Sequence, residues 1–193
     1  MPAEITLIRH GETAWSTNGR HTGITDLSLV ENGRREALLL KKRLAHCTFD
    51  AVFVSPLARA QETCQLTGYF DGAITTRDAA EWNYGKYEGL KTDEIHRTHP
   101  NWEVFFNGAP GGESPSDVAA RADRLIETML QKGERIALFS HGHFLRALAV
   151  RWMGQPIKVG AHLLLSTASV STLGYERDIR VISSWNETTF LHD

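Results

Sequence analysis

Ile5–Thr13 (ITLIRHGET) is the stretch that decides the fold, because a short apolar run ends here abruptly in a cation, an imidazole and a glycine. The apolar part predicts a buried strand, and Gly11 allows a ligand to come close to the backbone. In open α/β sheets, ligands bind at the carboxyl ends of the strands. Arg9 and His10, which follow the run directly, are therefore candidate site residues.

Two later apolar runs end in residues of the same kind. Ala51–Val54 leads into Ser55–Arg59 (SPLAR), and Arg135–Phe139 leads into Ser140–His143 (SHGH). If the three runs form strands of one sheet, two histidines and two arginines meet at one edge of it. Imidazole can attack phosphorus and guanidinium groups neutralise phosphate charge, so this set suits phosphoryl transfer.

The rest of the chain alternates helices and strands in the α/β manner. The patterns predict helices over about 31–46, after Pro56, over 116–131 and over 143–152, short helices on either side of Pro100, a strand near 74–76, and a terminal hairpin over 169–184. Residues 17–27 are expected to form a loop. Because no linker or repeat interrupts the chain, we expect one domain over 1–193, with a cap-like insertion at about 81–114.

The bulk composition is that of an ordinary globular protein. Of the 193 residues, 41% are hydrophobic and 23% are charged, and the formal net charge is −2. No basic block is present, so neither a nucleic acid nor a membrane is expected as a partner. Cys47 and Cys64 have no metal-ligand spacing and are expected to be buried free thiols. The first residues resemble neither a signal peptide nor a membrane span, which makes a cytoplasmic protein the default.

Each histidine has a plainer alternative to a catalytic role. A buried, hydrogen-bonded structural histidine is the first alternative for His10. For His141 and His143 the rival is a metal-binding pair, since His-x-His after a strand is a common ligand spacing. Such a site needs carboxylate ligands, and Glu12 is the nearest candidate among the strand ends. We therefore expect no metal at this edge.

Four motifs taken together resemble a known family. They are Arg9–Thr13 (RHGET), Ser55–Thr63 (SPLARAQET), Glu81–Gly85 (EWNYG) and Ser140–His143 (SHGH), and they follow the order found in the histidine phosphatase superfamily, also called phosphoglycerate mutase-like. The resemblance spans most of the chain. It implies a three-layer α/β sandwich with a mostly parallel central sheet flanked by helices, and an enzyme that needs no cofactor.

The resemblance also implies a role for each matching residue. His10 would be the nucleophile that becomes phosphorylated, and Glu81 would protonate the leaving oxygen and then activate water. Arg9, Arg59 and His141 would form the phosphate pocket with His10. The substrate site would be lined by Ser16, Thr22, Gly23, Tyr84, Gly142 and His143. Ser16 departs from the asparagine often found at its position in the family.

Two features separate a phosphatase from a mutase of this family. His141 follows Glu81 by sixty positions (141 − 81), which leaves little room for the basic segment that binds a substrate carboxylate in the mutases. Lys91 also stands one position before the place of the mutase lysine, which Thr92 occupies. Both features favour hydrolysis.

Within the family the motifs look most like bacterial broad-specificity acid phosphatases and sedoheptulose bisphosphatase-like enzymes. Arg20, His21 and Lys86 could serve a second phosphate or could be solvated loop charges. We expect a metal-independent phosphomonoesterase acting on small phosphorylated metabolites, either phosphosugars or phosphorylated acids. The alternatives are a cofactor-dependent phosphoglycerate mutase-type isomerase and an inactive binder of phosphorylated ligands. The oligomeric state stays open, with a homodimer as one option.

Overall fold

The computed structural model of the protein describes residues 3–192. The strands are β1 (Glu4–Arg9), β2 (Ala51–Val54), β3 (Ile74–Thr75), β4 (Arg135–Ser140), β5 (Val170–Glu176) and β6 (Ile179–Glu187). The α-helices are α1 (Ala14–Asn18), α2 (Glu31–Leu44), α3 (Ala58–Thr67), α4 (Thr92–His96), α5 (Val104–Asn107), α6 (Pro115–Leu130) and α7 (Gly142–Trp152). The 3-10 turns are η1 (Arg77–Ala79), η2 (Gly85–Tyr87), η3 (Ile157–His162) and η4 (Thr189–Leu191).

These strands form one mixed sheet in the order β3-β2-β4-β1-β5-β6. The first four in that order are parallel to one another. Strand β5 is antiparallel to its neighbours β1 and β6, so β6 again runs in the direction of β1. Arg9 lies opposite Ser140 in the pairing of β1 with β4, and Val54 lies opposite Phe139 in the pairing of β2 with β4. The three apolar runs therefore end together at one edge, and the predicted mostly parallel sheet is confirmed.

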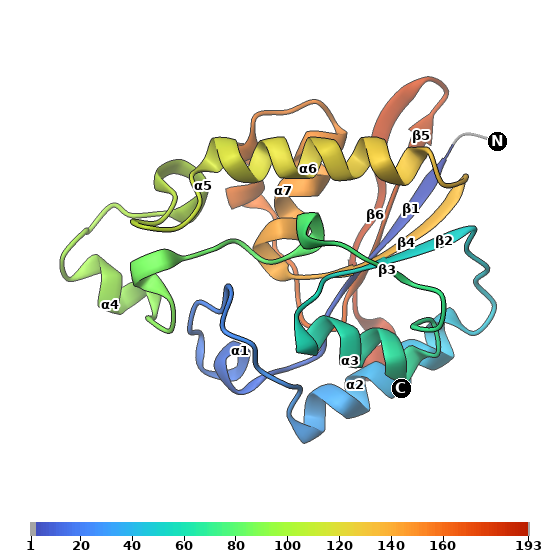
Figure 1. The fold of residues 1–193 in the computed structure, drawn as a ribbon, viewed down its shortest axis with the longest axis horizontal. Coiled ribbons are helices and arrows are strands. Elements are labelled where there is room, and N and C mark those ends of the chain that lie inside the picture. The colour runs from blue at the N-terminus through green and yellow to red at the C-terminus, as the bar shows by residue number, and fades with distance from the viewer. Residues whose placement is uncertain (1–2, 193) are drawn as a thin grey trace.

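Helices cover both faces of the sheet: α6 and α7 lie on one side, and α2 and α3 on the other (Figure 1). Strand β4 shows why both are needed. Ile136 and Leu138 are buried in the core with α6 and α7, whereas Ala137 and Phe139 are buried in the core with α2 and α3. Because successive side chains point to opposite faces, an unbroken apolar strand requires cover on each side. The predicted three-layer sandwich is confirmed.

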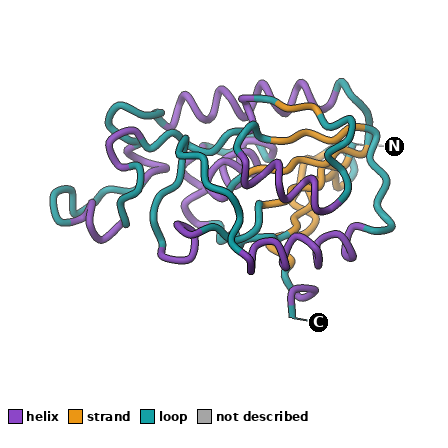
Figure 2. Tube along the Cα trace, turned by 60° about the horizontal axis from the view of Figure 1, so that its bottom comes forward, coloured by secondary structure: helices purple, strands orange, loops and turns teal. Residues whose placement is uncertain are grey.

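The strands gather at one end of the molecule, and the opposite end consists of loops and short helices (Figure 2). Helices α4 and α5 lie at this second end, beyond the strands (Figure 1). Both belong to the segment at about 81–114 that the sequence analysis expects to be a cap-like insertion. No helix within residues 3–192 combines the length and the apolar character that a membrane crossing requires.

The structure differs from the local expectations in two places. Helix α1 begins where the sequence predicts only the approach to a loop, because the side chains of Thr13 and Ser16 each accept the other's backbone amide in a capping box. A helix of five residues is too short to show a periodic pattern. Helix α2 ends at Leu44, so Cys47 lies beyond it and is only half-buried, while Cys64 is buried in α3. Both are free thiols, as predicted.

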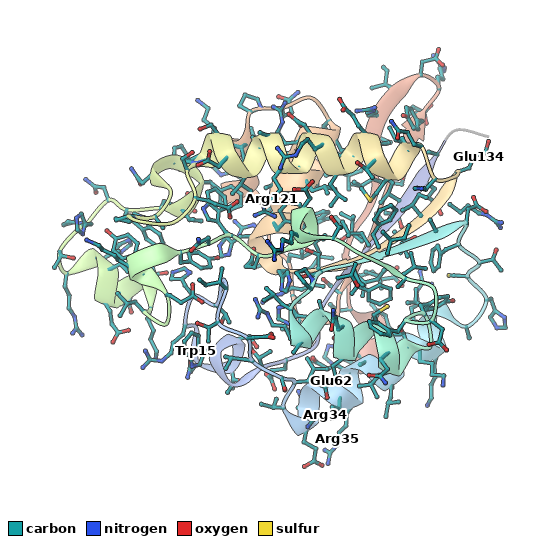
Figure 3. All side chains as sticks on the ribbon, viewed as in Figure 1. Trp15, Arg34, Arg35, Glu62, Arg121 and Glu134 are labelled. Carbon is teal, nitrogen blue, oxygen red and sulfur yellow. The ribbon has the colours of Figure 1, made fainter. Side chains whose placement is uncertain are left out.

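One carboxylate ties the two helices of the lower layer together. Figure 3 shows Glu62 of α3 beside Arg34 of α2, whose Nε lies 2.6 Å from Glu62 Oε1. The other oxygen, Oε2, accepts the backbone amide of Leu29 at 3.0 Å, just before α2 begins. Because the ion pair is partly exposed, it adds little to the stability of the fold. Its main effect is to fix the position of α3 relative to α2.

Two leucines of α2 test which face of this helix packs against the sheet. Leu40 is fully buried, and Leu38 is 49% exposed. We expect Leu40→Ala to lower the free energy of unfolding by about 2–5 kcal/mol, because it leaves a cavity. Leu38→Ala, the matched control, should change it by less than about 1 kcal/mol. Urea denaturation measures both values, and equal losses would contradict the assignment of the buried face.

Candidate active site

A pocket opens at the edge where β1 and β4 end. It is lined by Arg9, His10, Thr13, Ser16, Arg20, His21, Thr22, Glu81, Tyr84, Gly142, His143, Arg146 and Leu165. Most of the residues expected at the site are in this lining. Arg59, His141 and Gly23 are instead buried behind it, and Lys86 is not part of it.

The imidazole of His10 is held in one orientation. Its Nδ1 lies 2.7 Å from the carbonyl oxygen of Gly11, so Nδ1 carries the proton and donates it. The unprotonated nitrogen is then Nε2, which makes no hydrogen bond within residues 3–192. The backbone is fixed as well, because the His10 amide donates to Ser140 O and its carbonyl accepts from Ala168 N, each at 3.0 Å. This fixed tautomer leaves a lone pair available on Nε2.

The surroundings keep His10 neutral. The side chain is 5% exposed, and burial lowers the pKa of His10 well below its usual range. The positive charges of Arg59 and Arg9 lower it further. A neutral imidazole is the form that can attack phosphorus.

His141 lies beside His10, with the two ring centroids 5.1 Å apart. Arg59 donates through Nε to His141 Nδ1 at 3.1 Å, and a guanidinium can only donate. The proton of His141 is therefore on Nε2, which donates to Ser55 Oγ at 2.6 Å. Both ring nitrogens are engaged with protein groups, so the arrangement does not match a metal ligand. Among the described residues, no cluster of three His, Cys, Asp or Glu side chains could hold a metal ion.

Arg59 organises the loop in front of it. Besides His141, its guanidinium donates to the carbonyl oxygens of Thr22, Gly23 and Thr25, at distances of 2.9–3.1 Å. In this structure its contacts are with this loop and with His141. The loop carries Thr22 into the pocket lining and keeps Gly23 against the 81–89 segment, where Glu88 Oε1 accepts the Gly23 amide at 2.7 Å.

Arg9 reaches the pocket with unused hydrogen-bonding capacity. One terminal nitrogen, Nη1, donates to the Leu165 carbonyl, while the buried Nε has no partner among the described residues. A Cβ added to Gly142 would lie 3.2 Å from Arg9 Cζ, so the glycine leaves room for the guanidinium. A buried N–H donor that has no hydrogen-bond partner and belongs to a cation indicates that an anionic ligand binds there.

Glu81 sits at the amino end of α7. Its Oε1 accepts the amides of Trp82 and Phe144, each at 2.8 Å, and its Oε2 accepts the amide of His143 at 3.1 Å. The carboxylate therefore lies in the positive field at the start of the helix, on the pocket wall. This places a carboxyl group in the same pocket as His10.

The backbone of Glu81 is fixed by an ion pair that sequence reasoning missed. Arg121 of α6, labelled in Figure 3, donates to the carbonyl oxygens of Ala80 at 2.7 Å and Glu81 at 3.4 Å. The same guanidinium makes two 2.9 Å bonds to the Glu113 carboxylate. Arg121 and Glu113 are eight residues apart, but the carbonyl groups that the arginine binds come from a segment about 40 residues earlier, so no local pattern reveals this role.

Tyr84 and His143 also line the pocket. Their Oη and Nδ1 atoms lie 2.6 Å apart. Burial lowers the pKa of His143 well below its usual range and raises the pKa of Tyr84 well above its own, so both are neutral. Ser16 Oγ is engaged with the backbone of Thr13, which it both accepts from and donates to. Ser16 lines the pocket, but its hydroxyl group is used to cap helix α1.

The charge of the lining is positive. Three arginines (Arg9, Arg20 and Arg146) face one carboxylate, Glu81. Such a pocket suits a multiply charged anion such as a phosphomonoester. Arg146 was not singled out from the sequence, although a signal exists. It is a charge in an apolar stretch of α7, one turn after His143, and so on the same helix face.

Comparison with known proteins agrees with this geometry. A family model described as the histidine phosphatase superfamily (branch 1) matches residues 5–188. An acid phosphatase of Mycobacterium tuberculosis is 41% identical over 183 residues, covering 93% of this chain and 90% of that protein. The sedoheptulose 1,7-bisphosphatase of Saccharomyces cerevisiae is 29% identical over 180 residues, covering 77% and 66%. The solved structure of the Mycobacterium tuberculosis open reading frame Rv3214 has a TM-score of 0.92 and 39% identity, over 96% of this chain and 98% of that one.

The hydrogen bonds predict the tautomers of the two central histidines. His10 should carry its proton on Nδ1 and His141 on Nε2. Burial lowers the pKa values of both rings well below the usual range, so both should stay neutral through the pH range, about pH 6.5, in which the same residues gain protons in the unfolded chain. Nitrogen-15 chemical shifts of the histidine rings measure tautomer and charge together. Protonation of either ring in the folded protein above about pH 6 would contradict this electrostatic account.

Proposed function

Since this chain belongs to the histidine phosphatase superfamily (branch 1) and is a phosphatase, we propose that it hydrolyses small phosphomonoesters in two steps through a phosphohistidine at His10. One observation carries the proposal. A neutral imidazole, fixed with its lone pair on Nε2, shares a positively charged pocket with the Glu81 carboxyl group. A purely binding site has no need of such a nucleophile beside an acid.

In the first step, the Nε2 lone pair of His10 attacks the phosphorus of the bound ester. The new N–P bond forms as the bond between phosphorus and the ester oxygen breaks. Protonated Glu81 gives its proton to the departing oxygen, and an alcohol leaves. Arg9 neutralises charge on the transferring group, using the Nε that has no protein partner among the described residues. The imidazole keeps its Nδ1 proton on Gly11 O throughout, so the positive phosphoimidazole is oriented by that carbonyl.

In the second step, Glu81 acts as a base. Its carboxylate takes a proton from a water molecule while the water oxygen attacks phosphorus. The N–P bond breaks, the electron pair returns to His10 Nε2, and inorganic phosphate leaves. Glu81 is again protonated and His10 is again neutral, so the cycle closes without any metal. Arg59 and His141 act from behind the pocket by fixing the Thr22–Thr25 loop and the face of His10.

Phosphate release from alkyl and aryl esters, in excess chelator, tests the proposal. His10→Ala should lose activity by about 10³-fold or more on every ester, because the nucleophile is gone. Glu81→Gln should lose about 10²–10⁴-fold on glycerol phosphate and less on p-nitrophenyl phosphate, because nitrophenolate leaves without a proton. His46→Ala, at an exposed histidine outside the pocket, is the matched control and should retain full activity.

Two results would overturn the proposal. Turnover close to the wild-type rate in folded His10→Ala would show that His10 is not the nucleophile. Loss of wild-type activity in chelator would indicate a metal hydrolase. Interconversion of 3- and 2-phosphoglycerate with a bisphosphate primer, faster than phosphate release, would assign the mutase reaction instead.

A further inference from the structure

The partially or fully buried arginines of residues 3–192 fall into two groups. Arg20, Arg121 and Arg151 each lie within 4.0 Å of a carboxylate. Arg9, Arg59 and Arg146 have no ion pair among the described residues, and all three belong to the active site. Burying a cation without an anion is costly, so this absence needs an explanation. For Arg9 the phosphoryl group supplies one, and Arg59 is held behind the pocket by His141 and the carbonyl oxygens of the Thr22–Thr25 loop. Arg146 has no such assignment.

The guanidinium of Arg146 is held in place by neutral groups. Nε donates to the carbonyl oxygen of Gly160 at 2.9 Å, and Nη2 donates to that of Ala161 at 3.1 Å. Its Cζ lies 4.7 Å from the centre of the Phe105 ring. The third nitrogen, Nη1, makes no hydrogen bond within the described part of the chain. The protein therefore orients this cation on the pocket wall and leaves its charge unpaired.

The acidic groups that act on Arg146 do not pair with it. Glu81 already accepts three backbone amides, and Glu103 caps the start of α5 by accepting the amide of Phe105. Both raise the pKa of Arg146 only from a distance, whereas burial lowers it. An anion bound at Nη1 would supply the missing partner, and charge-assisted bonds to a guanidinium are strong ones.

The other basic residues near the pocket do not offer the same site. Burial lowers the pKa of His21 to about 4, so this ring is neutral. Arg20 donates to the Gly89 carbonyl and lies 3.7 Å from Glu94. Lys86 lies outside the lining, so the second phosphate considered for it from the sequence has no support there. Arg146 is the cation that remains available.

We propose that Arg146 binds a second anionic group of the substrate, either a carboxylate or a second phosphate, and thereby selects phosphomonoesters that carry another anion. This inference rests on the proposed function of the site. Arg146 follows His143 by one turn of α7, and helical side chains lean toward the amino end of their helix, where the phosphoryl group would sit. One substrate with two anions would thus span from Arg9 to Arg146.

Matched substrate pairs test the assignment. Glycerol 3-phosphate and 3-phosphoglycerate differ by a carboxylate, and fructose 6-phosphate and fructose 1,6-bisphosphate differ by a phosphate. In the wild type, kcat/KM should be higher for the doubly anionic member of at least one pair, which identifies the anion. Arg146→Gln should lower the ratio within that pair by about 10- to 100-fold, the loss expected for one charge-assisted bond. Arg151→Gln, on the same helix but paired with Asp123, is the control and should leave the ratio unchanged.

The outcomes separate this inference from the function on which it rests. A wild type without preference in either pair, or an Arg146→Gln ratio that stays within twofold of the wild type, would overturn the role of Arg146 while the phosphatase stands. The wild-type preference is measured without any variant. It therefore tests whether the site selects a second anion even if Arg146→Gln does not fold. Failure of all four substrates and of p-nitrophenyl phosphate to release phosphate would instead overturn the proposed function.

Discussion

The parallel pairing of β1 with β4 is the constraint on which the site depends. It sets Arg9 opposite Ser140, so the residues that follow, His10 and His141, leave the sheet side by side. The His10 amide extends the same ladder by donating to the Ser140 carbonyl. A slip of one residue would exchange the side chains of the strand between the two faces, and each face packs against a different core. The packing of the sandwich thus fixes the spacing of the histidines.

At this buried edge, hydrogen bonds fix the tautomer of each central histidine. The Gly11 carbonyl fixes the proton of His10 on Nδ1, and Arg59 fixes that of His141 on Nε2. Desolvation and the neighbouring guanidinium groups keep both rings neutral. The cations remain charged yet partly unpaired, which prepares the pocket for an anion before one arrives. The nucleophile and the electrostatic field therefore have a common origin in the way this edge is buried.

The sequence predicted those parts of the site that follow a strand directly. The apolar runs before Arg9, Arg59 and His141 located three strand ends, and the structure places these strands side by side. Periodicity could not reveal α1, a single turn that depends on the Thr13–Ser16 capping box. It also missed Arg121, whose role depends on contacts with a distant segment. Arg146 was missed although its place one turn after His143, in an apolar stretch of α7, was a signal. A residue such as Arg121, whose role comes only from tertiary contacts, can be identified only once the fold is known.

The position of the phosphoryl group on His10 tests the central claim most directly. The fixed Nδ1 proton requires the N–P bond to form at Nε2. Rapid mixing with a radiolabelled phosphomonoester, an alkaline quench and chromatography of the hydrolysed protein would separate the two phosphohistidine isomers. The account predicts the isomer phosphorylated at Nε2, located at His10. Label on Nδ1, on another residue, or on no residue during rapid turnover would contradict it.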